Sequence, residues 1–166
     1  MNNDTIAYKR IGTIHTPFQT PEDMPIQPVG NETASGEVRL DNEYTQGVTA
    51  LSGFTHCILL YHFHQASTNT ELSVTPFLDS TSKGVFATRA PQRPNRIGMS
   101  VVKIEEIVGS TIQVTNIDVL DETPLLDIKP YVPDFDCPSS VTAGWLEEKG
   151  RQAETTQSDE RFTEPE

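Results

Sequence analysis

Two runs rich in β-branched residues, 97–108 and 111–121, are separated by only two residues, Gly109 and Ser110. Glycine in the first position of a two-residue connection is typical of a β-hairpin, because that position adopts a positive φ at which other residues are strained. The two runs are therefore predicted to be neighbouring antiparallel strands. This feature limits the chain to folds that contain an antiparallel sheet.

The rest of the chain favours a loop-rich, mainly β fold over a helical bundle. Its 166 residues include 12 prolines and 10 glycines against 35% hydrophobic residues, a composition that is rich in turns. Further strands are predicted over residues 7–15, 34–40 and 54–64, and the last of these is expected to be a central strand buried on both faces. Asn42 is expected to cap a short helix that ends near Gly53.

Other stretches are predicted to be irregular. Residues 19–33, 65–82 and 121–133 contain prolines and are read as loops, the last as a shaped edge or loop. Beyond Trp145 the chain is charged and almost without apolar residues, so it cannot bury enough surface to offset the entropy of ordering. We therefore predict a domain over residues 1–145 and an acidic, disordered tail over residues 146–166.

The chain as a whole is acidic, with a formal net charge of -12. Nucleic-acid binders usually present a basic surface, so this charge argues against a polyanionic partner unless a high-salt cytoplasm screens it. Cys57 and Cys137 have no CxxC spacing and indicate no disulfide framework. No apolar run reaches the ~18 residues that a membrane helix needs, and the first residues do not resemble a signal peptide. A cytoplasmic protein without a membrane partner is expected.

Positive charge is concentrated in residues 83–100, which contain no acidic residue. Two prolines make this segment stiff and non-helical, so it is predicted to be a preformed loop that faces an anion. Arginine suits that role because its planar guanidinium pairs with carboxylate or phosphate through two hydrogen bonds. The alternative is an ordinary solvated loop. The four cations are Lys83, Arg89, Arg93 and Arg96.

Histidines and aspartates supply further candidate groups. His56, His62 and His64 share the parity of one strand face, but a zinc site would need a further ligand and none has a diagnostic spacing. No metal site is predicted, and a hydrogen-bonding role at the end of the strand is favoured for one histidine. Asp118, Asp121 and Asp127 with Lys129 are compatible with a paired carboxylate, although turn and capping roles are the commoner function of such clusters. The chain has no Walker, G-x-G-x-x-G or G-x-S-x-G motif.

Residues 84–100 and 118–131, taken together, closely resemble the signature blocks of the TsaA-like family, whose characterised members are TrmO-type tRNA methyltransferases. Residues 11–18 and 53–64 supply supporting matches. The resemblance implies a single-sheeted antiparallel β-barrel with short helices, which binds S-adenosylmethionine outside any Rossmann fold and usually across a homodimer interface. It also implies methyl transfer to N6 of the threonylcarbamoyl-modified adenosine at position 37 of tRNA.

The resemblance carries site residues onto this chain. The implied cofactor contacts are Gln27, His62, Phe63, Arg89, Arg93, Leu120, Asp121, Asp127, Ile128 and Lys129. Asp127 or Tyr131 is expected to accept the N6 proton, and Arg96 and Lys83 are expected to contact tRNA. Transfer is an in-line displacement, so most of the acceleration is expected from alignment of the reacting atoms.

Three positions depart from the family pattern: Ile26 stands where an arginine is common, Arg96 where proline is usual, and Glu122 where glycine is usual. These departures leave two alternatives open. One is a methyltransferase of the same barrel type that acts on another substrate. The other is a non-catalytic nucleotide-binding or regulatory module, which the acidic surface favours.

Overall fold

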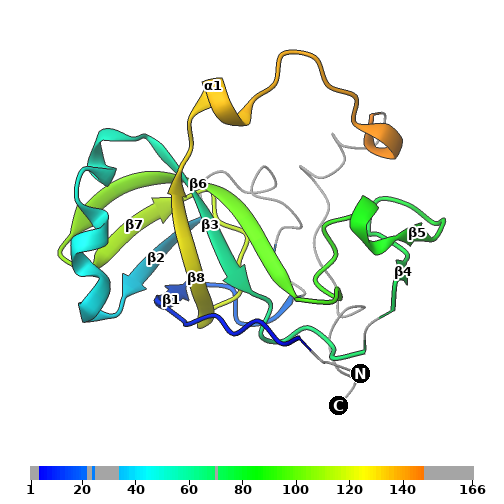
Figure 1. The fold of residues 1–166 in the computed structure, drawn as a ribbon, viewed down its shortest axis with the longest axis horizontal. Coiled ribbons are helices and arrows are strands. Elements are labelled where there is room, and N and C mark those ends of the chain that lie inside the picture. The colour runs from blue at the N-terminus through cyan, green and yellow to red at the C-terminus, as the bar shows by residue number, and fades with distance from the viewer. Residues whose placement is uncertain (1–3, 22–23, 25–33, 70, 148–166) are drawn as a thin grey trace.

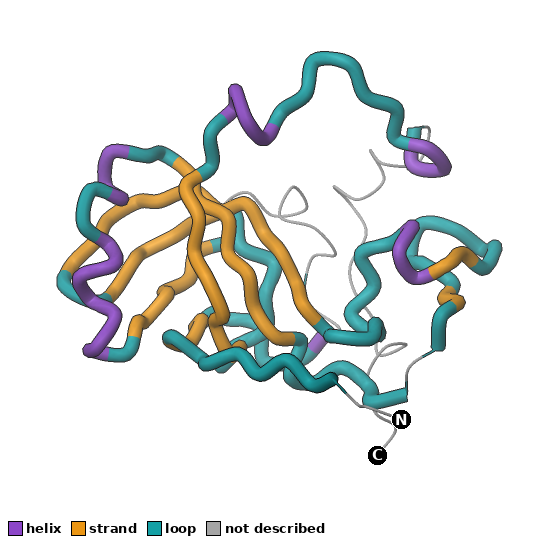
Figure 2. Tube along the Cα trace, in the orientation of Figure 1, coloured by secondary structure: helices purple, strands orange, loops and turns teal. Residues whose placement is uncertain are grey.

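A closed barrel of six antiparallel strands forms the body of the protein (Figures 1 and 2). The computed structural model describes residues 4–21, 24, 34–69 and 71–147. Around the barrel the strand order is β1-β2-β7-β6-β3-β8, and pairing of β8 with β1 closes it. The strands are β1 (Gly12–His15), β2 (Ser35–Leu40), β3 (His56–His62), β6 (Ile97–Val108), β7 (Thr111–Thr115) and β8 (Thr123–Pro130). The predicted single-sheeted antiparallel barrel is confirmed.

The predicted hairpin is the β6–β7 pair. Val108 pairs with Thr111, so Gly109 and Ser110 form the two-residue connection, and Gly109 has a φ of 60°. The second strand of the hairpin, β7, is shorter than predicted and ends at Thr115. The next residue, Asn116, adopts a left-handed conformation with a φ of 62°. A left-handed residue departs from the extended conformation of a strand. Residues 116–122 therefore form a loop instead of the end of a strand.

The prediction that residues 54–64 are buried on both faces is wrong. β3 alternates strictly, with Cys57, Leu59 and Tyr61 buried in the barrel while the intervening side chains are only partly covered. The physical reason is that the barrel is a single closed sheet. One face of each strand therefore points to the core and the other points outward.

The prediction that residues 121–133 are irregular is also wrong over most of its length. Residues Thr123–Pro130 form β8, which pairs with β1 on one side and with β3 on the other. Pro124 and Pro130 lie at the second and last positions of the strand, where a missing N–H is tolerated best. A register shift between Leu60 and Tyr61 marks a bulge where β8 carries an extra residue.

Smaller elements differ from the sequence predictions in length or type. The first predicted strand shrinks to Gly12–His15, and the short helix is two 3-10 segments, η3 (Asn42–Val48) and η4 (Leu51–Gly53). Asp41, not Asn42, occupies the N-cap position of η3, without a side-chain cap hydrogen bond. After β8 the chain forms α1 (Pro133–Asp136) and η6 (Gly144–Leu146). Within the described ranges, no helix has the length and apolarity to cross a membrane.

A small lobe stands beside one end of the barrel (Figure 1). It contains the two-stranded sheet β4 (Ser73–Val74) and β5 (Lys83–Gly84), followed by η5 (Val85–Ala87). Val74, Val85 and Ala90 are buried in it and Phe77 packs against them, separately from the barrel core. The loop predicted over residues 65–82 thus has its own small core, and this core holds the basic segment in place.

Leu59 and Leu72 provide a matched test of the barrel core. Leu59 is fully buried, whereas Leu72 is 63% exposed. We expect Leu59→Ala to lower the free energy of unfolding by about 2–5 kcal/mol, because it removes buried contacts and leaves a cavity. Leu72→Ala should change it by about 0.5 kcal/mol or less. Urea denaturation measures both, and equal losses would contradict the barrel as the main core.

Candidate functional site

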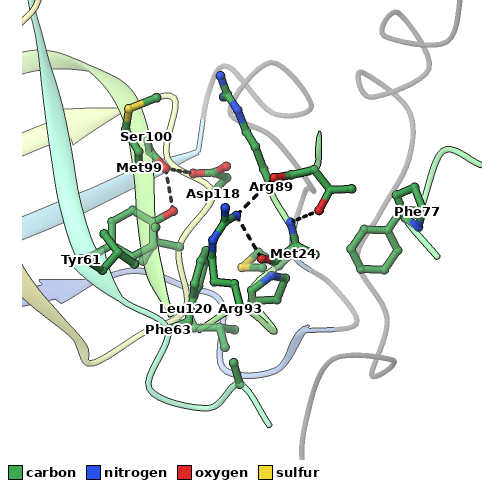
Figure 3. A pocket seen from close by; sticks show the side chains of 18 of the residues that line it. Met24, Tyr61, Phe63, Phe77, Arg89, Arg93, Met99, Ser100, Asp118 and Leu120 are labelled. Carbon is green, nitrogen blue, oxygen red and sulfur yellow. Dashed lines mark hydrogen bonds between the residues drawn. The ribbon is translucent and has the colours of Figure 1, made fainter. Parts of the chain in front are cut away.

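A cleft of about 1190 Å³ lies between the end of the barrel and the small lobe. The barrel contributes the end of β3 and the beginning of β6, and the loops 86–96 and 116–122 form the other walls. Trp145 and Leu146 of η6, which follows β8 in the chain, also line this cleft. In Figure 3, Phe77 of the small lobe lies across from the barrel residues Tyr61 and Ser100.

A buried hydrogen-bond network forms the barrel side of the cleft. Ser100 Oγ donates to Asp118 Oδ1 at 2.5 Å and lies 2.9 Å from Tyr61 Oη. Because the single proton of Ser100 is directed at the carboxylate, the Tyr61 hydroxyl donates to Ser100. Their exposed fractions are 4% for Tyr61, 2% for Ser100 and 9% for Asp118. The three side chains therefore form a fixed chain of hydrogen bonds that ends at a carboxylate.

Burial shifts the titration of this network. It raises the pKa of Asp118 to about 6, although the Ser100 hydrogen bond, the backbone N–H of Asp118 and the charge of Arg89 act in the opposite direction. Burial also raises the pKa of Tyr61 well above its usual range, so the phenol stays protonated. At neutral pH Asp118 is mostly ionised, and its carboxylate is more basic than that of an exposed aspartate.

The basic segment forms the opposite wall, and its cations have different roles. Arg89 and Arg93 line the cleft, and Arg93 Nη1 also donates to the carbonyls of Thr88 at 3.2 Å and Ala90 at 3.4 Å. These bonds fix the loop in addition to its prolines. Figure 3 shows both arginines near Asp118.

Arg96 and Lys83 do not line the cleft and make structural contacts. Arg96 has a φ of 48° and donates from Nη1 to the carbonyl of Ala66 at 3.2 Å. Lys83 pairs with Asp79 at 3.1 Å and lies 5.8 Å from the centre of the Trp145 ring. The two residues predicted to contact RNA thus tie the loop to its neighbours.

Gly98 allows the aromatic side of the cleft to form. A Cβ at this position would clash with the rings of Tyr61 and Phe63, which meet edge to face with centroids 5.4 Å apart. Gly98 and Phe63 both line the cleft, as does Leu120 from the opposite loop. Because Gly98 has no side chain, the two rings can pack against β6 at the wall of the cleft.

The cofactor residues implied by the resemblance fall into separate places. Phe63, Arg89, Arg93 and Leu120 come together in the cleft. His62 is the last residue of β3, and its partner across the sheet is Ile97. Asp121 accepts hydrogen bonds from the Thr16 amide at 3.1 Å and from the Gln19 side chain at 3.1 Å. Gln27 and Ile26 lie outside the described residues.

The remaining predicted residues lie on or just after β8, away from this cleft. Asp127 and Lys129 form an ion pair at 2.8 Å, while Ile128 packs against the barrel core. The Tyr131 ring lies 6.4 Å from that of His56, at the opposite end of β3 from the cleft. A single chain therefore does not bring Asp127 or Tyr131 to the group of cleft residues.

Sequence reasoning did not assign Ser100, Tyr61 or Trp145 to the site, and it assigned Asp118 no specific role. The strand alternation alone indicates that Tyr61 and Ser100 point inward. Their contact depends on the β3–β6 register, in which Leu59, not Tyr61, is the partner of Ser100. Trp145 reaches the lobe by donating from Nε1 to the Ala87 carbonyl at 2.8 Å, which no local pattern indicates. Among the described residues, no cluster of three metal-ligating side chains occurs.

Comparison with known proteins identifies the family. Residues 13–137 match the model of the tRNA-methyltransferase O N-terminal domain. The chain belongs to this family. A probable S-adenosyl-L-methionine-binding protein of Pyrococcus abyssi is 46% identical over 157 residues, covering 95% of this chain and 85% of that protein.

Two further comparisons match different lengths of longer proteins. A solved structure of TrmO from Pseudomonas aeruginosa matches with a TM-score of 0.72 and 36% identity, over 85% of this chain and 62% of that one. A human tRNA (adenine(37)-N6)-methyltransferase is 38% identical over 108 residues, 62% of this chain and 24% of that protein. The chain thus spans less than two thirds of these two proteins.

One departure from the TrmO-type pattern has a clear structural setting. Glu122, where glycine is usual, adopts a φ of 60° in the turn before β8. Glycine reaches this conformation without strain, which explains its use there. Glu122 therefore adopts this turn at some conformational cost.

Gly98 and Gly84 provide a test of the aromatic wall. Gly98→Ala forces the Tyr61 and Phe63 rings to move, so we expect a loss of about 1–3 kcal/mol in the free energy of unfolding. A Cβ at Gly84 meets nothing within 4 Å, so Gly84→Ala should stay within about 0.5 kcal/mol of the parent protein. Urea denaturation measures both changes. Unchanged stability of Gly98→Ala would show that the rings do not pack as described.

Proposed function

We propose that the protein transfers the methyl group of S-adenosylmethionine to N6 of the threonylcarbamoyl-modified adenosine 37 of tRNA. The observation that carries the proposal is a cleft combining two arginines, an apolar wall and a buried carboxylate, in a chain of the tRNA-methyltransferase O family. The names of the human and mouse relatives, tRNA (adenine(37)-N6)-methyltransferase, support the substrate.

The cleft residues fit the cofactor chemically. Arg89 and Arg93 offer donors for the carboxylate of its methionine part, and Phe63 and Leu120 offer an apolar wall for adenine. Asn116 also lines the cleft, and its Oδ1 is the one buried side-chain oxygen or nitrogen of the described residues that lacks a hydrogen-bond partner. That acceptor suits an amino group of a ligand. When bound, the cofactor supplies an electrophilic methyl group on a sulfonium centre.

The outer face of the β3–β6 pair supports the predicted homodimer. Ile58 pairs with Val101 and Leu60 with Met99 on this outward face, and Met99 is 43% exposed. Met99 and Val101 also line the cleft, so the apolar face is continuous with the site. A second copy seated on this face would lie at the cleft.

The same face offers an explanation for the predicted cofactor residues on β8, which lie away from the cleft within one chain. Asp127 and Lys129 are the β8 partners of Leu60 and Ile58, so they border the apolar pairs. We propose that the second copy brings its Asp127–Lys129 segment to this cleft, which would complete the cofactor site. His62 lies beside Ile97 at the edge of the same face.

The proposed dimer can be tested at Leu60, with Val108 as the control. Val108 lies at the other end of β6 and is 62% exposed. We expect Leu60→Glu to sediment as a monomer and to lose S-adenosylhomocysteine binding by about tenfold or more, because a carboxylate in an apolar interface is costly. Val108→Glu should remain a dimer. Sedimentation velocity and calorimetry measure both, and a parent protein that sediments as a monomer would contradict the interface.

An acidic chain needs local positive charge to bind tRNA. Arg96 bonds to the Ala66 carbonyl and Lys83 pairs with Asp79, and the net charge of the chain is -12. We expect recognition of tRNA to depend on Arg96 and Lys83 at the loop surface and on entry of the adenosine into the cleft. High salt would weaken the repulsion between the remaining surface and the phosphates.

A direct assay tests the function. The full-length protein is incubated with methyl-labelled S-adenosylmethionine and either threonylcarbamoylated tRNA or the same tRNA without that modification. Label is expected in the modified adenosine and absent from the unmodified tRNA. Tight binding of the cofactor without transfer to either tRNA would refute this substrate and favour another one. Absence of cofactor binding would favour a non-catalytic module.

A further inference from the structure

Within one chain, Asp118 has a position in the cleft that neither Asp127 nor Tyr131 shares. Of the described residues that line the cleft, it is the one that carries a carboxylate. It lies in the loop between β7 and β8 and is 9% exposed, with Arg89 as the opposing charge that acts on it. Figure 3 shows it between the two hydroxyl residues of the barrel and the arginines of the basic loop.

The reaction proposed above needs a proton acceptor. N6 of a carbamoylated adenosine is bonded to the purine, to the carbamoyl carbon and to one hydrogen, and its electron pair is delocalised into both neighbours. Methylation forms an N6–CH3 bond and breaks the S–CH3 bond, whose electrons return to sulfur. The N–H electrons stay on nitrogen and the proton leaves. A base that accepts this proton as the N–C bond forms lowers the barrier, typically by a factor of about 10²–10⁴.

Asp118 has the chemistry of such a base. Its Oδ1 accepts the Ser100 hydrogen bond, and an ionised carboxylate offers about four acceptor positions, so others remain for a ligand. Ser100 is itself held by Tyr61, and this chain fixes the orientation of the carboxylate. Burial also makes the carboxylate more basic while it stays ionised at neutral pH.

We propose, on the basis of the function proposed above, that Asp118 accepts the N6 proton of the target adenosine. Ser100 and Tyr61 are positioning residues, because they act through Asp118 and donate no group to the reaction. The step is balanced: nitrogen gains the methyl group, sulfur becomes a neutral thioether, and the proton passes to the Asp118 carboxylate. No metal or further reactant is needed.

Asp118→Asn tests the role of the carboxylate, because asparagine keeps the shape and cannot accept the proton. In the full-length protein with saturating S-adenosylmethionine and threonylcarbamoylated tRNA, we expect kcat to fall by about 10²–10⁴-fold. The KM for tRNA and the affinity for S-adenosylhomocysteine should change by less than about threefold. The control is Asp41→Asn, an exposed carboxylate that pairs with Arg10 outside the cleft. It should keep the kcat of the parent protein.

The pH dependence gives a second readout. The parent rate should rise with pH through about 6, as Asp118 loses its proton, and then level off. Ser100→Ala removes a hydrogen bond that lowers the pKa of Asp118, so its rising limb should move to higher pH. Tyr61 and Arg89 are the other titratable and charged groups that act with Asp118, and burial keeps the Tyr61 phenol protonated in this range.

His64 also lines the cleft, and burial and the charge of His62 lower its pKa. It bonds to Thr123 at 3.3 Å and not to Ser100. The rise of the rate with pH could therefore remain at the same pH in Ser100→Ala and persist in Asp118→Asn. That result would assign the proton transfer to His64 and overturn the proposal.

The outcomes separate this inference from the function on which it rests. If the parent protein transfers no methyl group to tRNA, both the proposed function and the role of Asp118 are refuted. Transfer by the parent together with parent-like kcat and pH profile in Asp118→Asn would overturn the role of Asp118 alone. If Asp118→Asn fails to fold, as a thermal melt would show, the shift of the limb in Ser100→Ala decides the question.

Discussion

The pairing of β8 with both β1 and β3 is the constraint on which the rest of the structure depends. It turns an open sheet into a closed barrel, and it leaves no strand edge unpaired among the six. Closure also defines an inside, so each strand sends alternate side chains into one core. The bulge beside Leu60 lets β8 keep both partners although its residues do not match β3 one to one.

The barrel interior is filled by side chains, so the space for a ligand lies at its end. There the core changes from aliphatic residues to Tyr61 and Ser100, which hydrogen-bond to Asp118. A buried carboxylate is costly unless its hydrogen bonds are satisfied, and the two hydroxyls supply that compensation from within the barrel wall. The small lobe and Trp145 cover the other side of this polar end. The cleft therefore lies between the apolar core of the barrel and the basic loop.

The basic loop owes its shape to more than its prolines. Arg93 bonds to carbonyls of its own segment, and Arg96 bonds across to Ala66. Arginine residues that look like free cations in the sequence thus hold the backbone in a fixed path, while Arg89 and Arg93 still reach the cleft. In a chain with a net charge of -12, such a loop concentrates positive charge where the cleft opens.

The sequence by itself determined the β6–β7 hairpin, because Gly109 and its flanking runs are local signals, and it determined the fold and family through two signature blocks. It failed at β8, where the prolines favour a loop and pairing on both sides overrides that preference. The family resemblance grouped Asp127 and Tyr131 with the cleft residues, whereas one chain leaves both outside the cleft. The contact of Ser100 with Asp118, and the separation of Tyr131 from the cleft, were decided by the tertiary structure, because strand register and barrel closure set which distant residues meet.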